Sequence, residues 1–557
     1  MSLEYFLFCL IILWPLLKPG YVFALDMVFT PVLRWPTEFS QAFLFQGALA
    51  LTNLVLPSWL IQKLILIAIL FLAGLGMHVA APVNNRWARY FAGFLYLINP
   101  FVYARFLYGH YLLLLAYAFL PWAYKSFLLF LRQPNWPNAL KVFGWSFLII
   151  HASAHSALFL LIVYAITFTS FHLSRRQSKV FGRHLKYLLT VLLMLAMTSS
   201  YWLWPLINKR GATADYVIEK IDAQHLLSFR TDADADRGLL WNIAAMYGFW
   251  GEREWRYINQ KEMLPWWFYF SLVFIVLAII GCLSVLFRPD HSQNNHPWFY
   301  RQRWLALSLA VVYAVAFLFA LGVAYQPLAD FFYRLNDIFP WFKGYREPQK
   351  FVSLIVFVYA LLGALGVEWL LKISSNVRPF KNHRQFTGLL TGALLLLPLF
   401  YSPGMFNGFR RQLPVTDYPA SWYEVNDILN NDQDDFRAVF FPWHQYMSFG
   451  FLRFKVVANP AAKFFDREMI AGDNAEFGRV YTTSDRPESK YIQDQVISRK
   501  TEFDNLGRIL DPLNVKYVML AQGADYLSYD FLDKQIDLEL IYDDAHLKVY
   551  RNLAWSR

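Results

Sequence analysis

The hydrophobic pattern divides the chain into two unequal parts. In residues 1–402, long apolar runs recur, and each is close to the ~20 residues that an α-helix needs to cross a ~30 Å hydrocarbon core. These runs lie at about 3–18, 58–80, 87–104, 110–131, 138–153, 155–173, 186–207, 265–287, 304–324, 350–371 and 386–402. The pattern predicts a polytopic α-helical membrane domain of about eleven transmembrane helices, with its first span retained rather than removed as a signal peptide.

The rest of the chain, residues 403–557, is charged, and its apolar residues alternate. This alternation predicts strands at 436–444 and 514–521 and a hairpin at 538–552. The spacing of apolar residues at 421–431 predicts a helix. We therefore expect a small C-terminal α/β domain of about 150 residues, long enough to bury its own core.

Charge places the two parts relative to the membrane. The chain is 57% hydrophobic and 16% charged with a formal net charge of +11, whereas soluble domains average about 25% charged residues. Because Lys and Arg gather in short alternate connections, the basic balance indicates the positive-inside rule and not nucleic-acid binding. These connections, which we expect in the cytoplasm, hold the basic residues of 86–89, 125–141, 175–186, 288–303 and 372–384.

This orientation puts the C-terminal domain and every long or acid-containing connection outside the cytoplasm. The same external face then holds the loop around Asp26, the turns near His110 and His151, and the segments 208–264 and 325–349. Nucleotide donors are scarce on that side. A transferase acting there needs an energy-rich donor carried by a lipid.

The loop 18–36 carries a single acid, Asp26, in otherwise apolar sequence after the first span. A carboxylate there can accept the proton of an incoming hydroxyl, help to hold a divalent metal, or merely cap a short interfacial helix. The following stretch, 37–54, has the spacing of an amphipathic helix. It would shape a groove for a lipid, or simply pack on other spans.

Cationic residues lie at the external ends of several spans. Arg105 and His110 sit between two spans, where a phosphate is a suitable partner for the guanidinium; snorkelling of Arg105 to the interface is the alternative. Lys343 and Arg346 run against the positive-inside bias, which suggests an anionic lipid-linked ligand. The alternative there is a structural pairing of Arg346 and Glu347 with the C-terminal domain.

Histidines and aromatic residues supply further candidates. His151 and His155 are four residues apart, but no Glu lies between them and no third ligand is evident, so a HExxH-type zinc site is not supported. They suit hydrogen bonding to a sugar or phosphate. Tyr247 and Trp250 could stack on a sugar ring or anchor the chain at the interface. The acidic run at 231–238 lacks the pattern of a calcium loop and predicts a solvated turn. No cofactor is demanded, although a divalent metal would fit the chemistry.

Four stretches together resemble a known superfamily. They are PGYVFALD (19–26), NPFVYARFLYGHYLLLLAYAFLPW (99–122), GFW (248–250) and GYREPQKF (344–351). They look like the GT-C superfamily of polyprenyl-phosphate-sugar glycosyltransferases, most of all the larger mycobacterial arabinofuranosyltransferases. The C-terminal pieces at 440–446 and 514–520 also resemble YfhO-like membrane proteins.

The resemblance implies a GT-C-like fold in which Asp26 is the catalytic base and Arg105, His110 and Arg346 are candidates for the donor phosphate. The implied partners are a polyprenyl-phosphate-linked sugar, a glycan or lipid acceptor, and membrane lipid, with no nucleic acid. Two alternatives remain open. A transporter or flippase of lipid-linked glycans would show internal repeats or broken spans at mid-membrane. A non-enzymatic assembly protein would use the C-terminal domain to bind a partner and would have no lipid-filled groove.

Overall fold

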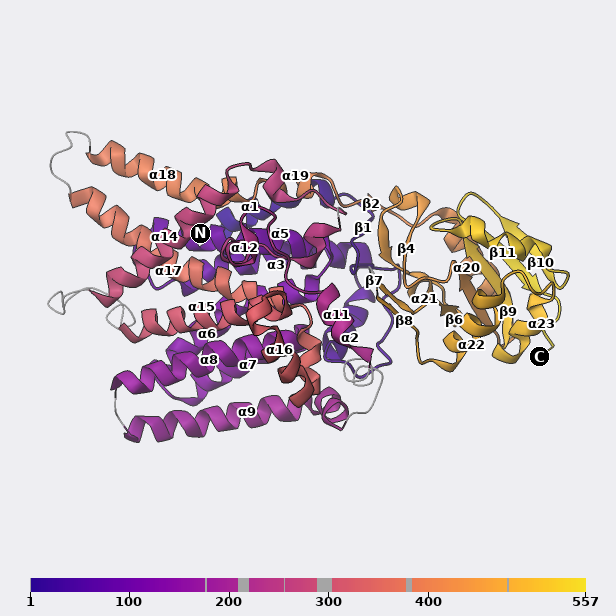
Figure 1. Ribbon diagram of the computed structural model, residues 1–557, viewed down its shortest axis with the longest axis horizontal. Helices are drawn as coiled ribbons and strands as arrows, with labels where there is room; N and C mark the ends of the chain where they lie inside the picture. Colours follow the sequence, from indigo (N-terminus) through magenta and orange to yellow (C-terminus); the bar gives the residue numbers. More distant parts are fainter. Residues whose placement is uncertain are drawn as a thin grey trace.

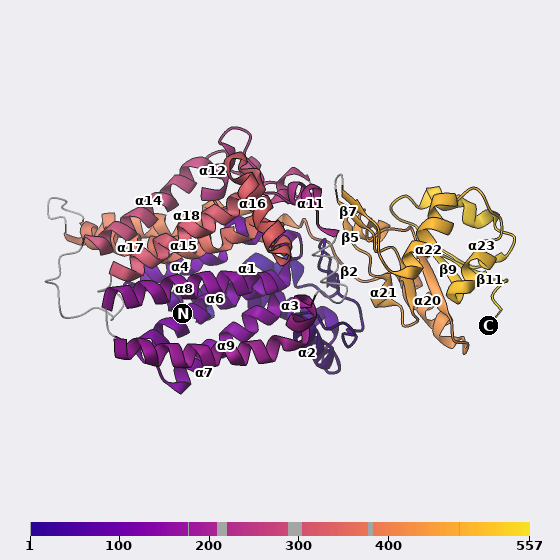
Figure 2. The ribbon, with the colours of Figure 1, turned by 60° about the horizontal axis from the view of Figure 1, so that its bottom comes forward.

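The computed structural model describes residues 2–175, 178–208, 220–254, 256–287, 303–376, 383–477 and 480–556. Parts of the basic connections at 175–186, 288–303 and 372–384 lie outside these described residues. A bundle of helices forms one end of the molecule, and a mixed α/β region packs against the other end of the bundle (Figures 1 and 2).

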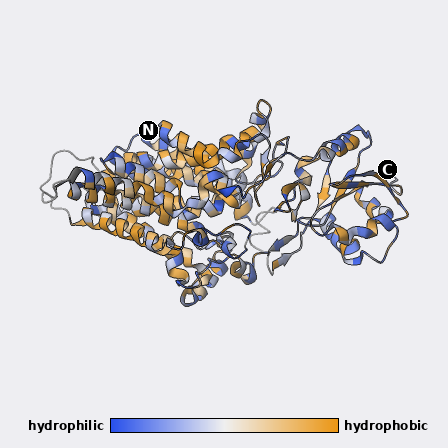
Figure 3. Ribbon diagram, turned by 90° about the horizontal axis from the view of Figure 1, so that it is seen from above, coloured by the Kyte–Doolittle hydropathy of each residue, from blue (hydrophilic) through white to orange (hydrophobic). Residues whose placement is uncertain are grey.

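Hydrophobic residues predominate along the helices of the bundle (Figure 3). Among the described residues, seven helices are long and apolar enough to cross a membrane, or up to eight if α18 and its bent continuation count as one span. The chain is thus a multi-pass membrane protein. The bundle helices are α1 (Ser2–Leu13), α3 (Ser58–Ala80), α4 (Arg86–Leu97), α5 (Pro100–Leu107), α6 (Tyr111–Arg132), α7 (Trp136–Ala152), α8 (Ala154–Arg175), α9 (Ser178–Ile207), α14 (Trp267–Leu286), α15 (Arg303–Leu321), α17 (Val352–Asn376) and α18 (His383–Tyr401).

The prediction of one continuous span at 87–104 is wrong. The chain breaks between α4 and α5 because Asn99 adopts an extended conformation and its side chain accepts a hydrogen bond from the amide of Val102. Pro100 then starts the new helix at a position where no amide donor is needed. The resulting short helix α5 carries Arg105 toward the end of the bundle. The count of eleven spans stays a prediction.

Shorter helices connect the spans. They are α2 (Phe43–Asn53), α11 (Ala223–Ser228), α12 (Gly238–Ala244), α13 (Gln260–Met263), α16 (Gln326–Ile338) and α19 (Phe406–Arg410), with 3₁₀ turns at Trp250–Arg253, Pro340–Tyr345 and Pro348–Phe351. Helix α2 confirms the helix expected within 37–54. Both α2 and α11 lie at the end of the bundle that faces the α/β region (Figure 1).

We call residues 415–556 the C-terminal region. Its main sheet has five strands in the order β10-β11-β9-β3-β6; β3 runs parallel to β6 and β9, and the other pairs are antiparallel. The strands are β3 (Arg437–Phe441), β6 (Met469–Ala471), β9 (Val515–Ala521), β10 (Leu538–Asp543) and β11 (Leu547–Asn552). They confirm the strands and the hairpin predicted from the sequence.

Helices cover both faces of this sheet. Since successive residues of a strand point to opposite faces, Ala438 and Phe440 pack toward α20 (Ala420–Asn431), and Val439 and Phe441 pack toward the other face. That second face is covered by α22 (Pro487–Gln495) and α23 (Leu506–Leu510). Helix α20 confirms the predicted helix and buries Trp422, Val425 and Leu429 at helical spacing.

The loop that follows α1 joins the two parts. Its strand β1 (Tyr21–Val22) pairs with β2 (Val415–Thr416). Further along the loop, the amide of Ala458 donates to Leu25 O at 2.8 Å, and the hydroxyl of Tyr418 donates to Phe29 O at 3.0 Å. One continuous hydrophobic core therefore runs from the bundle through this loop into the C-terminal region.

Candidate active site

The backbone around Asp26 is locked against the turn between α5 and α6. The amide of Asp26 donates to Tyr108 O at 3.1 Å. Gly109 has φ +79°, and a Cβ there would lie 2.5 Å from the amide nitrogen of Met27. Only glycine allows both the left-handed backbone and this close approach. The two loops consequently hold Asp26 beside His110.

The carboxylate of Asp26 is held from two sides. Its Oδ2 lies 3.0 Å from Nε2 of His110, and its Oδ1 accepts a hydrogen bond of 2.8 Å from the hydroxyl of Tyr446. The side chain is 36% exposed. The first loop, the α5–α6 turn and the C-terminal region therefore converge on one carboxylate that a reactant can still reach.

The contact with Arg105 defines which ring nitrogen of His110 carries the proton. Its Nδ1 lies 3.0 Å from Nη1 of Arg105. A guanidinium only donates hydrogen bonds, so Nδ1 must accept one. The proton of the ring then lies on Nε2 and points at Asp26. His110 thus acts as a donor to the carboxylate, and Arg105 fixes its tautomer.

Arg105 is completely buried and already paired. Its Nη1 lies 2.5 Å from Oε2 of Glu347, Nη2 donates to Gln349, and its guanidinium carbon lies 4.3 Å from the centre of the Phe249 ring. The alternative of snorkelling to the interface is therefore wrong. Because an unpaired charge at this depth would be costly, Glu347 and Gln349 explain why an arginine can occupy the position.

Glu347 gathers further partners around the same point. Its Oε1 lies 3.2 Å from Nζ of Lys350, and its Oε2 accepts a hydrogen bond of 3.2 Å from the indole of Trp250. Burial opposes ionisation of Glu347, but Lys350 and Arg105 outweigh burial and hold its pKa well below the usual range. The sequence left open that Arg346 and Glu347 pair with the C-terminal region. For Glu347 this alternative is wrong, because its ion pairs are with Arg105 and Lys350.

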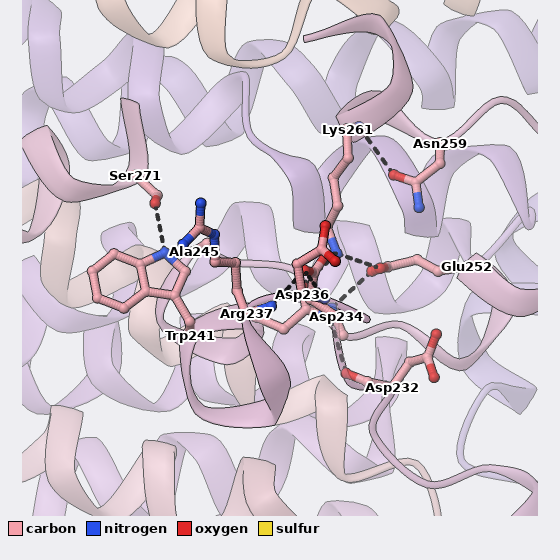
Figure 4. Close-up of polar contacts among 12 residues, drawn as sticks. Asp232, Asp234, Asp236, Arg237, Trp241, Ala245, Glu252, Asn259, Lys261 and Ser271 are labelled. Atoms are coloured by element: carbon pink, nitrogen blue, oxygen red, sulfur yellow. Dashed lines mark hydrogen bonds and ion pairs between the residues drawn. The ribbon is translucent and has the colours of Figure 1, made fainter. Parts of the chain in front are cut away.

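A cluster of polar side chains surrounds Lys261 beside the turn that carries Phe249 and Trp250, and Figure 4 shows the contacts within this cluster. Nζ of Lys261 lies 2.9 Å from Asp234 and 3.3 Å from Glu252. The other oxygen of Glu252 accepts hydrogen bonds from the amides of Gly248 and Phe249, at 2.7 and 3.0 Å. The cluster thereby fixes the turn that presents both aromatic rings to Arg105 and Glu347.

The prediction of a solvated acidic turn at 231–238 is wrong for two of its three acids. The side chains of Asp232 and Asp234 are each only 14% exposed, and they pair with Arg253 and Lys261. Burial raises the pKa of Asp232 to about 6, although Arg253 opposes that shift. These acids are structural ion-pair partners. The sequence could not show this, because Arg253 lies 21 residues after Asp232 and Lys261 lies 27 residues after Asp234.

Of the two predicted histidines in the 150–156 stretch, His155 contacts the network of polar side chains around Glu347 and His151 does not. His155 donates from Nε2 to Gly344 O at 2.8 Å and lies 3.3 Å from Lys350, so it belongs to the far side of the Glu347 network. His151 bonds to Phe147 O of its own helix and to Thr198 O, away from that network.

The remaining predicted site residues are two cations, Arg346 and Lys343, and two aromatic residues, Tyr247 and Trp250. Arg346 lies over the ring of Phe229 at 4.9 Å, and Lys343 lies in the turn Pro340–Tyr345. Tyr247 and Trp250 are each 4% exposed, and both pack among other aromatic rings. The substrate contacts expected of these residues stay predictions.

Two side chains that contact the predicted residues, Glu347 and Tyr446, were not among the site residues predicted from the sequence. Glu347 had a visible signal, because it is the one acid of 339–351. Tyr446 had none, since its contact with Asp26 spans 420 positions of sequence. Within the described part of the chain, no group of three or more His, Cys, Asp or Glu residues is arranged to hold a metal ion.

The chain is similar to known proteins in its three-dimensional structure, whereas comparisons of its sequence found no match. No protein-family model and no curated protein matches the sequence. The structure of arabinofuranosyltransferase AftD from Mycobacteria aligns with a TM-score of 0.63 at 12% identity, covering 99% of this chain, and a second AftD structure gives 0.62 at 14%. ArnT from Cupriavidus metallidurans, bound to undecaprenyl phosphate, aligns with a TM-score of 0.50 at 12% identity, covering 99% of this chain and 97% of ArnT.

The chain spans only about two fifths of AftD, since the match covers 40% of that protein. At these identities the likeness concerns the fold. The Asp26 loop, the bundle and the C-terminal region all fall within the aligned 99% of this chain. We conclude that the chain has the fold of the GT-C membrane glycosyltransferases.

Proposed function

We propose that the chain is a membrane glycosyltransferase that moves a sugar from a polyprenyl-phosphate carrier to a glycan or lipid acceptor. The observation that carries the proposal is the reachable carboxylate of Asp26, held by His110 and Tyr446 at one end of the bundle. The fold shared with AftD and ArnT supports the reaction class. The undecaprenyl phosphate bound to ArnT supports a lipid-phosphate donor.

Asp26 is the general base of the proposed reaction. Its carboxylate accepts the proton of an acceptor hydroxyl, and the hydroxyl oxygen attacks the anomeric carbon of the sugar. The bond between that carbon and the phosphate oxygen breaks, and the lipid phosphate leaves with the bonding electrons. The proton on Asp26 then passes to solvent through its exposed side.

Arg105 and His110 support the base. Both amino groups of the Arg105 fork are already engaged by His110, Glu347 and Gln349. This geometry favours a positioning role for Arg105 over direct contact with a phosphate. Arg346 and Lys343 remain the candidates for stabilising the charge that develops on the leaving phosphate. The burial of Tyr247 and Trp250 favours a supporting role for these rings rather than stacking on a sugar.

The proposed site faces away from the cytoplasm. The C-terminal ends of α8, α14 and α17 and the N-terminal ends of α9, α15 and α18 lie at the end of the bundle opposite the C-terminal region (Figure 1). In the sequence, the predicted cytoplasmic Lys and Arg residues lie at and between these helix ends. The C-terminal region is then extracytoplasmic, and the donor reaches the site from the outer half of the membrane. This topology suits a sugar that has been carried across on a lipid.

The test uses purified full-length protein in liposomes with a panel of polyprenyl-phosphate sugars and glycan or lipid acceptors. Asp26→Asn, which keeps the shape but removes the base, is expected to abolish transfer while leaving the protein folded. The matched control is Asp236→Asn, because Asp236 is an exposed acid of the run 231–238 that is not in contact with Asp26 in the described structure. Near-normal turnover by Asp26→Asn would rule out this role for Asp26.

A further inference from the structure

We infer that the C-terminal region is part of the active site, and that Tyr446 is a positioning residue that fixes the carboxylate of Asp26. The inference rests on the proposed function, since it names a further residue of the same site. Among the described residues, Oδ1 of Asp26 accepts its side-chain hydrogen bond from Tyr446. No side chain of the described first loop or bundle makes an equivalent contact with this oxygen.

Tyr446 reaches Asp26 from a hairpin docked on the first loop. The hairpin consists of β4 (Tyr446–Ser448) and β5 (Val456–Ala458), in which Tyr446 is paired with Ala458. The amide of Ala458 donates to Leu25 O at 2.8 Å, while the hydroxyl of Tyr446 donates to Asp26 at 2.8 Å. The two members of one cross-strand pair thus hold two consecutive residues of the loop.

The hairpin is itself firmly held by the C-terminal region. Met447 and Val457 are buried in its centre. Ser448 O accepts a hydrogen bond of 3.0 Å from the amide of Ala524, and Phe449 forms a β-bridge with Gly523, just beyond β9. The position of the Tyr446 hydroxyl is therefore set by the sheet of the C-terminal region, not by a free loop.

Two donors on opposite oxygens fix the rotation of the Asp26 carboxylate. His110 holds Oδ2 and Tyr446 holds Oδ1, so the remaining lone pairs keep one direction relative to the incoming hydroxyl. Displacement of a catalytic group by about 1 Å can cost about 100-fold in rate. The charge of Asp26 in turn acts on Arg105, Tyr257 and Lys463.

The first test does not depend on activity. Hydrogen exchange of residues 21–34 is measured in full-length protein with Tyr446→Phe, in the wild-type and in the Asp26→Ala background. Tyr446→Phe is expected to speed exchange of the loop in the wild-type background and to add nothing in Asp26→Ala, where the hydroxyl has no carboxylate to hold. An equal effect in both backgrounds, or no effect in either, would overturn the inference whatever the activity.

The second test reads catalysis with a polyprenyl-phosphate sugar that the wild-type protein uses. Tyr446→Phe should lower kcat by roughly 10- to 100-fold and leave KM for the donor unchanged, as expected for a misplaced base. The control is Tyr542→Phe, which removes a similar hydroxyl–carboxylate contact, 2.7 Å to Glu424, elsewhere in the C-terminal region. An unchanged kcat in Tyr446→Phe contradicts the inference, whereas a wild-type protein that transfers no sugar contradicts the proposed function and leaves the exchange test decisive.

Discussion

Nε2 of His110 lies 3.0 Å from Oδ2 of Asp26. From this contact a line of polar side chains runs inward through Arg105 and Glu347 to Lys350 and then to His155. The chain of contacts begins at a carboxylate that is 36% exposed and leads to Arg105, Glu347 and Lys350, whose side chains are at most 12% exposed. The network thus joins the exposed carboxylate to side chains that are largely withdrawn from solvent.

The hydrogen bond from His110 can be tested by substitutions that differ in donor capacity. His110→Phe removes the donor, and we expect kcat to fall by about 10- to 100-fold because the carboxylate loses one of its two fixed contacts. His110→Gln keeps an N–H donor on a side chain of similar reach and should recover part of the loss. The measurement is kcat and donor KM in liposomes. Equal activity in His110→Phe and wild type would show that the contact is dispensable.

The close approach at Gly109 predicts a strong effect of a single methyl group. Gly109→Ala places a Cβ 2.5 Å from the amide nitrogen of Met27 at a φ of +79°, so the loop that carries Asp26 must move. We expect a large loss of turnover together with faster hydrogen exchange in residues 21–34. Gly144→Ala, within helix α7, is the control, because no atom other than its chain neighbours and the backbone of its own helix lies within 4 Å of the added carbon. Normal turnover in Gly109→Ala would mean that the backbone contact does not position Asp26.

The buried ion pair between Arg105 and Glu347 predicts a stability effect that depends on both partners. Arg105→Met leaves Glu347 with one cationic partner fewer in a buried site, and removal of one member of such a pair typically costs about 3–5 kcal/mol. Glu347→Gln removes the carboxylate that pairs with both Arg105 and Lys350. In that background Arg105→Met breaks no ion pair, so it should lower the unfolding temperature less than it does in the wild-type background. An equal effect of Arg105→Met in the two backgrounds would contradict this account.

The sequence was most informative where one local pattern decides the structure. Apolar runs predicted the bundle, alternation predicted β3, β9 and the β10–β11 hairpin, and the spacing of Trp422, Val425 and Leu429 predicted α20. The break at Asn99 was missed. A capping residue followed by Pro100 outweighed an otherwise continuous apolar run there.

The candidate site was only partly visible in the sequence because its contacts join distant segments. Asp26, Arg105 and His110 stood out as ionisable residues among apolar ones, and the structure brings these three together. The role of Glu347 depends on a partner 242 positions away, and that of Tyr446 on one 420 positions away. Such pairings follow from the tertiary fold and leave no periodic signal in the chain.

The C-terminal region contains a histidine whose charge should make its stability depend on pH. Nδ1 of His444 lies 2.8 Å from Glu476, and Nε2 lies 3.0 Å from Asp525. The hydrogen bond to Glu476 is the largest of the effects that raise the pKa of His444 above its ordinary value. Because the folded state binds the proton more tightly than the unfolded chain, the stabilisation is fully present below about pH 6.5 and is lost as the pH rises through the folded-state pKa.

His444→Gln keeps hydrogen-bonding capacity but cannot become charged, so it should remove this pH dependence. We expect wild type to unfold at a higher temperature than His444→Gln at pH 5.5, and the difference to shrink toward pH 8.5. The measurement is the thermal unfolding midpoint of full-length protein in detergent across that range. Tyr542→Phe serves as the control, because its difference from wild type should not follow the titration of His444. A gap between wild type and His444→Gln that stays constant or widens with rising pH would show that the imidazole between Glu476 and Asp525 does not carry a proton in the folded state.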